Sequence, residues 1–151
     1  LRMKAGLGDE ELDVTAECLT GLMAVEPERS LEFVRERLRA PDEALAEAAA
    51  LALGESREPN ALAALCAHRD HTILSSDMED VVLLAIALTR RDEAVDYLLR
   101  VVADDTPANA ARAVGAMRIY AHDTTTSERL RDAVEARDAQ DASAAFREHF
   151  G

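Results

Sequence analysis

The residues best suited to chemistry are histidines that lie beside carboxylates. Residues 68–71 read His-Arg-Asp-His, and His122 precedes Asp123 further along the chain. Two imidazoles near a carboxylate can bind a metal ion or exchange protons near neutral pH. We expect the first cluster to lie in a loop just past a helix end, where the helix dipole favours an imidazolium without any catalytic duty. The sequence therefore predicts no metal site and no catalytic residue here.

The chain has two cysteines, Cys18 and Cys66, and each falls within an apolar helical pattern. A thiolate can act as a nucleophile, but a small buried side chain is the simpler interpretation of a cysteine on an apolar helix face. Two isolated cysteines do not indicate a disulfide framework, so we expect a reducing, cytoplasmic setting. The motifs G-x-S-x-G, G-x-G-x-x-G and the P-loop are absent from the sequence. We therefore predict no cofactor.

The chain is strongly and evenly acidic. Its formal net charge is −13 over 151 residues, and no segment forms a basic stripe. Nucleic acids and anionic membrane surfaces both bind through clustered Lys and Arg, so the sequence disfavours both as partners. An acidic surface instead favours a basic or amphipathic protein segment through electrostatic complementarity.

The elements that must position these residues are predicted to be helices. Aromatic residues make up 3% of the chain and Trp is absent, which leaves Ala, Leu, Val and Met to fill a core of closely packed helices. Apolar periodicity and helix-end signals predict four helix pairs and a short amphipathic tail reaching Phe150. The predicted helices span residues 9–25, 27–39, 42–53, 59–68, 77–90, 92–103, 107–120 and 127–137.

The helix ends carry recognisable signals. Pro27, Pro59 and Pro107 fit the first helical position, where the missing N–H is not needed. Ser76 is predicted to form a capping box with a glutamate three residues later. Gly54 follows the last periodic residue of its helix and is predicted to form a left-handed C-cap.

An internal repeat relates the pairs. The first helices align on one anchor position, with about 30 to 35 residues between successive anchors, which is the period of a helix-pair solenoid. Residues 81–88 are apolar nearly all round, which predicts burial at the centre of the stack. The alternative is an exposed apolar binding patch. The anchors are Met23, Leu53, Leu88 and Met117.

Residues 46–54, followed by Pro59 and by residues 61–65, resemble the short HEAT-like repeat first associated with phycobilisome lyases. The resemblance extends from Asp9 to about Arg137. It implies an all-α fold, an α-solenoid of about four helix pairs, with residues 1–151 forming one domain or part of a longer array. HEAT-repeat dimetal hydroxylases carry His-Glu dipeptides, which this sequence lacks, and HEAT-like DNA glycosylases need a basic, aromatic surface.

The repeat also suggests a binding surface on the second helices. If Leu31, Leu62 and Val95 are equivalent, then the residues two positions later, Phe33, Ala64 and Tyr97, are equivalent too. The resemblance implies that the second helices line the concave face, so these residues are expected to frame an apolar notch. A polar rim around aromatic anchors is typical of protein interfaces. The predicted rim residues are Glu32, Asp96 and Arg100.

The sequence therefore favours a scaffold that binds a protein partner on the second-helix, concave face. Two alternatives stay open. Phe33 and Tyr97 can instead fill gaps between neighbouring helix pairs. The chain can also be a bilin-lyase-like or other pocket-bearing enzyme component, because such proteins present acidic residues and a pocket without a sharp motif.

Overall fold

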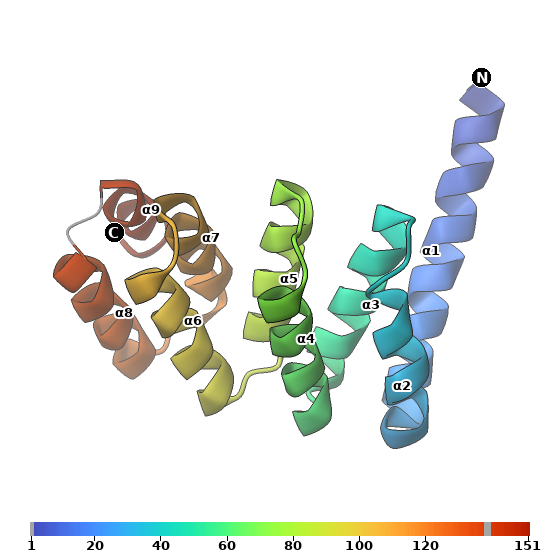
Figure 1. Ribbon diagram of the computed structural model, residues 1–151, viewed down its shortest axis with the longest axis horizontal. Coiled ribbons are helices and arrows are strands. Elements are labelled where there is room, and N and C mark those ends of the chain that lie inside the picture. Colours follow the sequence, from blue (N-terminus) through green and yellow to red (C-terminus); the bar gives the residue numbers. More distant parts are fainter. Residues whose placement is uncertain (1, 138–139) are drawn as a thin grey trace.

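The computed structural model describes residues 2–137 and 140–151, and within them the chain is entirely helical, without a β-strand. The helices follow one another along a single stack (Figure 1). No described helix combines the length and the apolar character needed to cross a membrane. The elements are α1 (Arg2–Val25), α2 (Pro27–Arg37), α3 (Glu43–Ser56), α4 (Pro59–His71), α5 (Ser76–Leu88), α6 (Asp92–Asp104), α7 (Pro107–Ala116), the 3₁₀ turn η1 (Met117–Tyr120), α8 (Thr124–Arg137) and α9 (Gln140–Phe150).

The stack has two layers, one built from the first helix of each pair and one from the second. In the first layer α1, α3, α5 and α7 pack against one another in order, and α9 continues this layer beyond α7. In the second layer α6 and α8 pack closely, whereas α4 and α6 make few direct contacts. The predicted α-solenoid of four helix pairs is confirmed. The predicted tail, α9, occupies the place of a fifth first helix.

The helix starts follow local hydrogen bonding. Pro27, Pro59 and Pro107 begin α2, α4 and α7 as predicted. The predicted cap of α5 is wrong by one residue. Ser75, and not Ser76, is the N-cap, because its hydroxyl accepts the backbone N–H of the third residue along at 3.1 Å.

The start of α8 differs more. The helix was predicted to begin at residue 127, but the three threonines at 124–126 form its first turn. Asp123 explains the earlier start, since its carboxylate accepts the backbone N–H of Thr125 at 3.2 Å and the hydroxyl of Thr126 at 2.6 Å. The hydrogen bond from the Thr126 hydroxyl holds the pKa of Asp123 below its usual value. A carboxylate at this position also complements the helix dipole.

Gly54 lies inside α3 and does not end it, contrary to the prediction. The helix continues to Ser56, and Arg57 takes the left-handed conformation with φ 55°. A Cβ on Gly54 would lie 2.8 Å from the Cα of Ala85 on α5. Because the obstacle is backbone, no side chain can fit without moving a helix. Gly54 therefore allows α3 and α5 to approach closely.

Burial corrects the predicted register of the third first helix. Met23, Leu53 and Met117 are 2%, 0% and 0% exposed, as anchors should be. Leu88 is only half-buried, and Ile86 is the fully buried residue instead. The sequence pattern gave no unique phase because residues 81–88 are apolar nearly all round. Their predicted central burial is confirmed. The corrected anchors are Met23, Leu53, Ile86 and Met117.

The second helices keep the predicted register. Val34, Leu65 and Leu98 form one fully buried row, and Leu130 extends it to the fourth pair. Successive members are about 32 residues apart, which is the period expected of a helix-pair solenoid. The same register therefore relates every residue of these four helices.

We expect Gly54→Ala to destabilise the fold by about 1–3 kcal/mol, because a new methyl group must push α3 and α5 apart. Gly21→Ala is the matched control within α1, since a Cβ there meets nothing within 4 Å. It should stabilise the fold by about 0.5–1 kcal/mol through helix propensity. Urea unfolding measures both effects. Similar changes at the two glycines would contradict the close approach of α3 and α5.

The corrected register makes a second prediction. Ile86→Ala should cost about 2–5 kcal/mol because it leaves a cavity in the core. Leu88→Ala should cost clearly less, since part of that side chain already lies in water. The free energies of unfolding of the two variants decide between Ile86 and Leu88 as the anchor. A larger loss at Leu88 would restore the original alignment.

Candidate partner-binding surface

Arg69 occupies a position that is apolar in the other repeats. In the register of the second helices it corresponds to Leu38, Val102 and Val134, which are 3%, 0% and 3% exposed. The Arg69 side chain is itself only 9% exposed. A buried guanidinium is costly unless its N–H groups are paired. The surroundings of Arg69 must therefore be polar.

Four side chains supply this polar environment. Arg69 Nε donates to Glu79 Oε1 at 2.6 Å, and its Nη2 donates to Asp105 Oδ2 at 2.6 Å. Its Nη1 lies 3.3 Å from the hydroxyl oxygen of Tyr97, and that hydroxyl donates to Asp70 Oδ1 at 2.6 Å. We call these five residues the Arg69 network. It joins α4, α5 and α6.

The network sets the charges at its centre. Burial alone would raise the pKa of Asp105, but the hydrogen bonds from Arg69, the Thr106 amide and Asn109 outweigh it and hold the pKa below its usual value. Burial raises the pKa of the Tyr97 hydroxyl, and the bond to Asp70 raises it further. At neutral pH the Asp105 carboxylate is therefore charged and Tyr97 is neutral.

A groove opens beside the network between α4 and α6, the two second helices that make few direct contacts. Its volume is about 480 Å³. Asp70 and Asp104 are exposed on it, and so is Arg100, whose guanidinium lies 5.6 Å from the centre of the Tyr97 ring. We call it the α4–α6 groove. It is lined by Arg69, Asp70, Tyr97, Arg100, Val101, Asp104, Asp105 and Thr106.

The three residues of the predicted notch have different environments. Phe33 is 44% exposed, with the Arg37 guanidinium 3.4 Å above its ring. Ala64 and Tyr97 are 9% and 8% exposed. The Tyr97 ring belongs to the Arg69 network, in agreement with the gap-filling alternative. Tyr97 is therefore not a free aromatic anchor, although it forms part of the wall of the α4–α6 groove.

The predicted rim residues lie on the second-helix face, and two of them are engaged in ion pairs. Glu32 pairs with Arg35 on its own helix at 3.0 Å. Asp96 pairs with Arg129 at 2.6 Å and so connects α6 to α8. Arg100 lines the groove.

The sequence interpretation missed Arg69, Asp70, Asp104 and Asp105. A signal for Arg69 was present, because a charged residue at a position that is apolar in the other repeats indicates a polar network or a site. To detect this signal, the alignment of the second helices must be extended by one helical turn, as far as Arg69. The acidic residues around Arg69 had no such signal, since their approach depends on how α4 and α6 are placed.

The histidine cluster is helical, and not a loop as predicted. It forms the last turn of α4, with His68 5% exposed and His71 exposed, so the two imidazoles do not face one site. Burial lowers the pKa of His68, and Arg39 lowers it further. His68 Nε2 has no hydrogen-bond partner. Among the described residues no three His, Cys, Asp or Glu side chains form a group that could hold a metal ion.

The two cysteines also differ from expectation. Cys18 is exposed on α1, so the prediction of a buried thiol is wrong there. Cys66 is half-buried, and burial together with the nearby Asp70 carboxylate raises its pKa to about 11. The Cys66 thiol is therefore protonated at neutral pH, which makes it a weak nucleophile.

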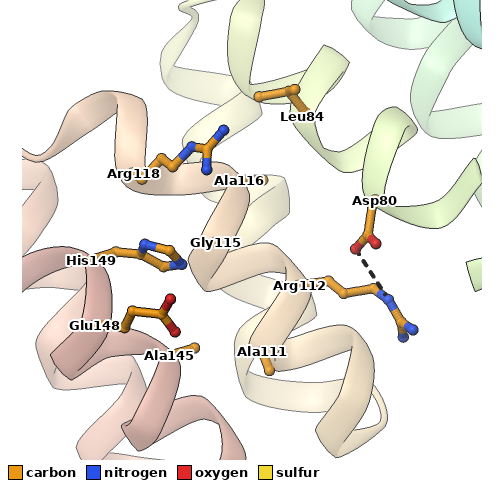
Figure 2. A pocket seen from close by; sticks show the side chains of 10 residues that line it. All are labelled: Asp80, Leu84, Ala111, Arg112, Gly115, Ala116, Arg118, Ala145, Glu148 and His149. Atoms are coloured by element: carbon orange, nitrogen blue, oxygen red, sulfur yellow. Dashed lines mark ion pairs between the residues drawn. The ribbon is translucent and has the colours of Figure 1, made fainter. Parts of the chain in front are cut away.

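A second groove crosses the first-helix layer between α5, α7 and α9. It has a volume of about 410 Å³, and Ala111, Gly115 and Ala145 line it together with charged residues. Figure 2 shows the His149 ring beside Gly115, and Arg112 turned toward Asp80, to which it pairs at 3.1 Å. Two carboxylates, of Asp80 and Glu148, and two guanidiniums, of Arg112 and Arg118, line this groove, so neither sign is in excess to select a ligand charge.

Comparison with known proteins gives a match to one family model. Residues 2–76 match the family model for HEAT repeats. The match spans α1 to α4 and ends at the first residue of α5. It supports a HEAT-like repeat family in general, and the finer likeness to phycobilisome lyases stays a prediction. Comparison with curated proteins and with solved structures gives no match.

We expect Arg69→Leu to destabilise the fold by about 3–5 kcal/mol, because it leaves Glu79 buried without its partner. Combining it with Glu79→Ala should recover part of this loss. The double variant has Leu at position 69 and Ala at position 79. These are the residue types that the preceding repeat has at the equivalent buried positions, Leu38 and Ala46. A double-mutant cycle by urea unfolding measures the coupling.

Strict additivity of the two losses would show that Arg69 and Glu79 are not coupled.

The pH dependence of the free energy of unfolding gives an independent measurement of the Arg69 network. A carboxylate whose pKa is lowered by folding stabilises the fold above its ordinary pKa, and this stabilisation disappears as the pH falls through the lowered value. Asp105 should therefore contribute to acid destabilisation of the wild type, and less in Arg69→Leu.

Proposed function

We propose that this protein is an interaction module that binds a segment of a partner protein on its second-helix face, centred on the α4–α6 groove. HEAT repeats commonly serve this purpose, and residues 2–76 match them. The observation that carries the proposal is the groove itself. It is a polar opening in the second-helix layer, lined by charged side chains from two successive repeats.

The charges of the groove favour a basic segment. Asp70, Asp104 and Asp105 line it, and Asp70 and Asp104 are exposed. Arg69 is already paired with Glu79 and Asp105, so it does not neutralise the exposed pair. A lysine or arginine of the partner can approach Asp104, while Arg100 can donate hydrogen bonds to a carboxylate or carbonyl oxygen beside it. The cytoplasmic setting stays a prediction.

The surface extends from the groove toward α2. Phe33, with Arg37 stacked on its ring, is the exposed aromatic residue of this layer. An exposed aromatic ring beside a cation suits contact with a partner side chain that is both apolar and polar. The partner segment is therefore expected to run across the second helices, with the groove as its main contact.

No observation favours the alternative of a pocket-bearing enzyme component. Cys66 shortly precedes the groove residues Arg69 and Asp70 in α4, and the pKa of its thiol is raised. His68 is buried, with a lowered pKa, and it makes no hydrogen bond through Nε2 that would orient it as a base. The proposal therefore rests on binding and not on catalysis.

A charge reversal in the groove tests the proposal. Asp104→Lys should reduce the amount of partner captured from the source organism and slow association by about tenfold at low salt, because it removes electrostatic attraction. Glu55→Lys is the matched control. Both residues are exposed and lie in the last turn of their helices, so the effects on the helix dipole are alike.

Capture should be measured by quantitative mass spectrometry, and association by surface plasmon resonance with the captured protein. Asp104→Lys should be affected and Glu55→Lys should behave as wild type. If Asp104→Lys and Glu55→Lys had equal effects, the partner would bind at another surface or would respond only to the overall charge of the protein. Circular dichroism confirms that both variants keep their helices.

A further inference from the structure

The outer side of α1 carries an apolar stripe that no other described element covers. Val14, Leu22 and Val25 are 60%, 42% and 81% exposed, and Cys18 between them is exposed as well. Successive members of the stripe are three or four residues apart, so they lie on one side of the helix. We call these four residues the α1 stripe.

The repeat register identifies Leu22 as a stacking position. Leu22 directly precedes the anchor Met23, and the equivalent residues in α3, α5 and α7 are Ala52, Ala85 and Ala116. These alanines are 1%, 0% and 6% exposed. Ala85 lies where α5 meets α3, against Gly54. At this position α5 therefore packs on the first helix before it, whereas the equivalent Leu22 in α1 is 42% exposed.

The opposite end of the stack is covered. The helix α9 packs against α7 through Ala142, which is fully buried, and through Ala145 and Phe146. Its exposed residues include Asp141, Arg147 and Glu148. These charged residues give α9 a polar outer face. The two ends therefore differ, and the end formed by α1 keeps an apolar surface.

The charges around the stripe define what can cover it. Glu11 is exposed in line with the stripe, one turn before Val14, Glu17 is exposed on its flank, and residues 11–25 contain no Lys or Arg. A second copy of the chain would bring the same acidic residues and a further net charge of −13.

We propose that the α1 stripe docks an amphipathic helix of a partner protein, with lysines or arginines flanking its apolar side. The helix continues the first-helix layer by packing on α1 as α1 packs on α3. Its basic residues pair with Glu11 and Glu17. This surface is separate from the α4–α6 groove and goes beyond the function proposed above.

Two synthetic peptides test the proposal with the full chain. Both form an amphipathic helix with the same apolar stripe, flanked in one peptide by lysines and in the other by glutamates. Fluorescence anisotropy should show binding of the lysine peptide and none of the glutamate peptide. Leu22→Ser combined with Val25→Ser should weaken binding by about tenfold or more, because apolar contact is lost without a change in charge.

The matched control is Ile73→Ser in the loop between α4 and α5. Ile73 is fully exposed, so its substitution removes apolar surface far from α1 and should leave the affinity for the lysine peptide unchanged. Asp104→Lys, in the α4–α6 groove, should also have little effect. A charge reversal on α1 tests for a gain of binding, which a misfolded variant cannot show. Glu11→Lys combined with Glu17→Lys should make the protein bind the glutamate peptide more tightly than the lysine peptide.

Three results would overturn the proposal. The first is equal binding of both peptides by the wild type. The second is an equal loss of affinity in Ile73→Ser. The third is a dimer in sedimentation equilibrium that Leu22→Ser with Val25→Ser dissociates, because a second copy would then cover the stripe.

Discussion

The close approach of successive first helices is the constraint on which the rest of the structure depends. Gly54 lies against the backbone of Ala85, and the positions equivalent to Ala85 in α3 and α7 are the buried alanines Ala52 and Ala116. Small residues let helix backbones come close, and close packing gives the dispersion contacts that a core poor in aromatic residues needs. The alanine-rich composition and the solenoid are therefore two aspects of one packing solution.

The second layer is packed less uniformly. Where α4 and α6 diverge, apolar side chains would leave a gap, and the Arg69 network fills part of it. The long Arg69 side chain reaches residues of two neighbouring helices, α5 and α6, which a leucine or valine at that position cannot do. The arrangement replaces apolar packing by paired charges and leaves an acidic opening at the surface. Stability and the α4–α6 groove thus have a common origin in the spacing of these two helices.

The two surfaces differ in chemistry. The groove is polar and charged, which suits an extended basic segment, whereas the α1 stripe is apolar and fits the face of a helix. Affinity at the groove should depend strongly on salt, and affinity at the stripe should depend more on buried apolar area. If both proposed surfaces bind, the helix stack between them sets the distance between the two bound segments.

The sequence by itself determined the helical class, the number of helix pairs and the register of the second helices. Prolines at helix starts and an apolar period of helical type are local signals. It did not determine the phase of α5, because a helix that is apolar nearly all round has no unique buried side. Nor did it reveal that Tyr97 belongs to a buried network and that Leu22 lies open. The same residue type is buried or exposed according to which neighbouring helix covers it, and only the tertiary structure decides that.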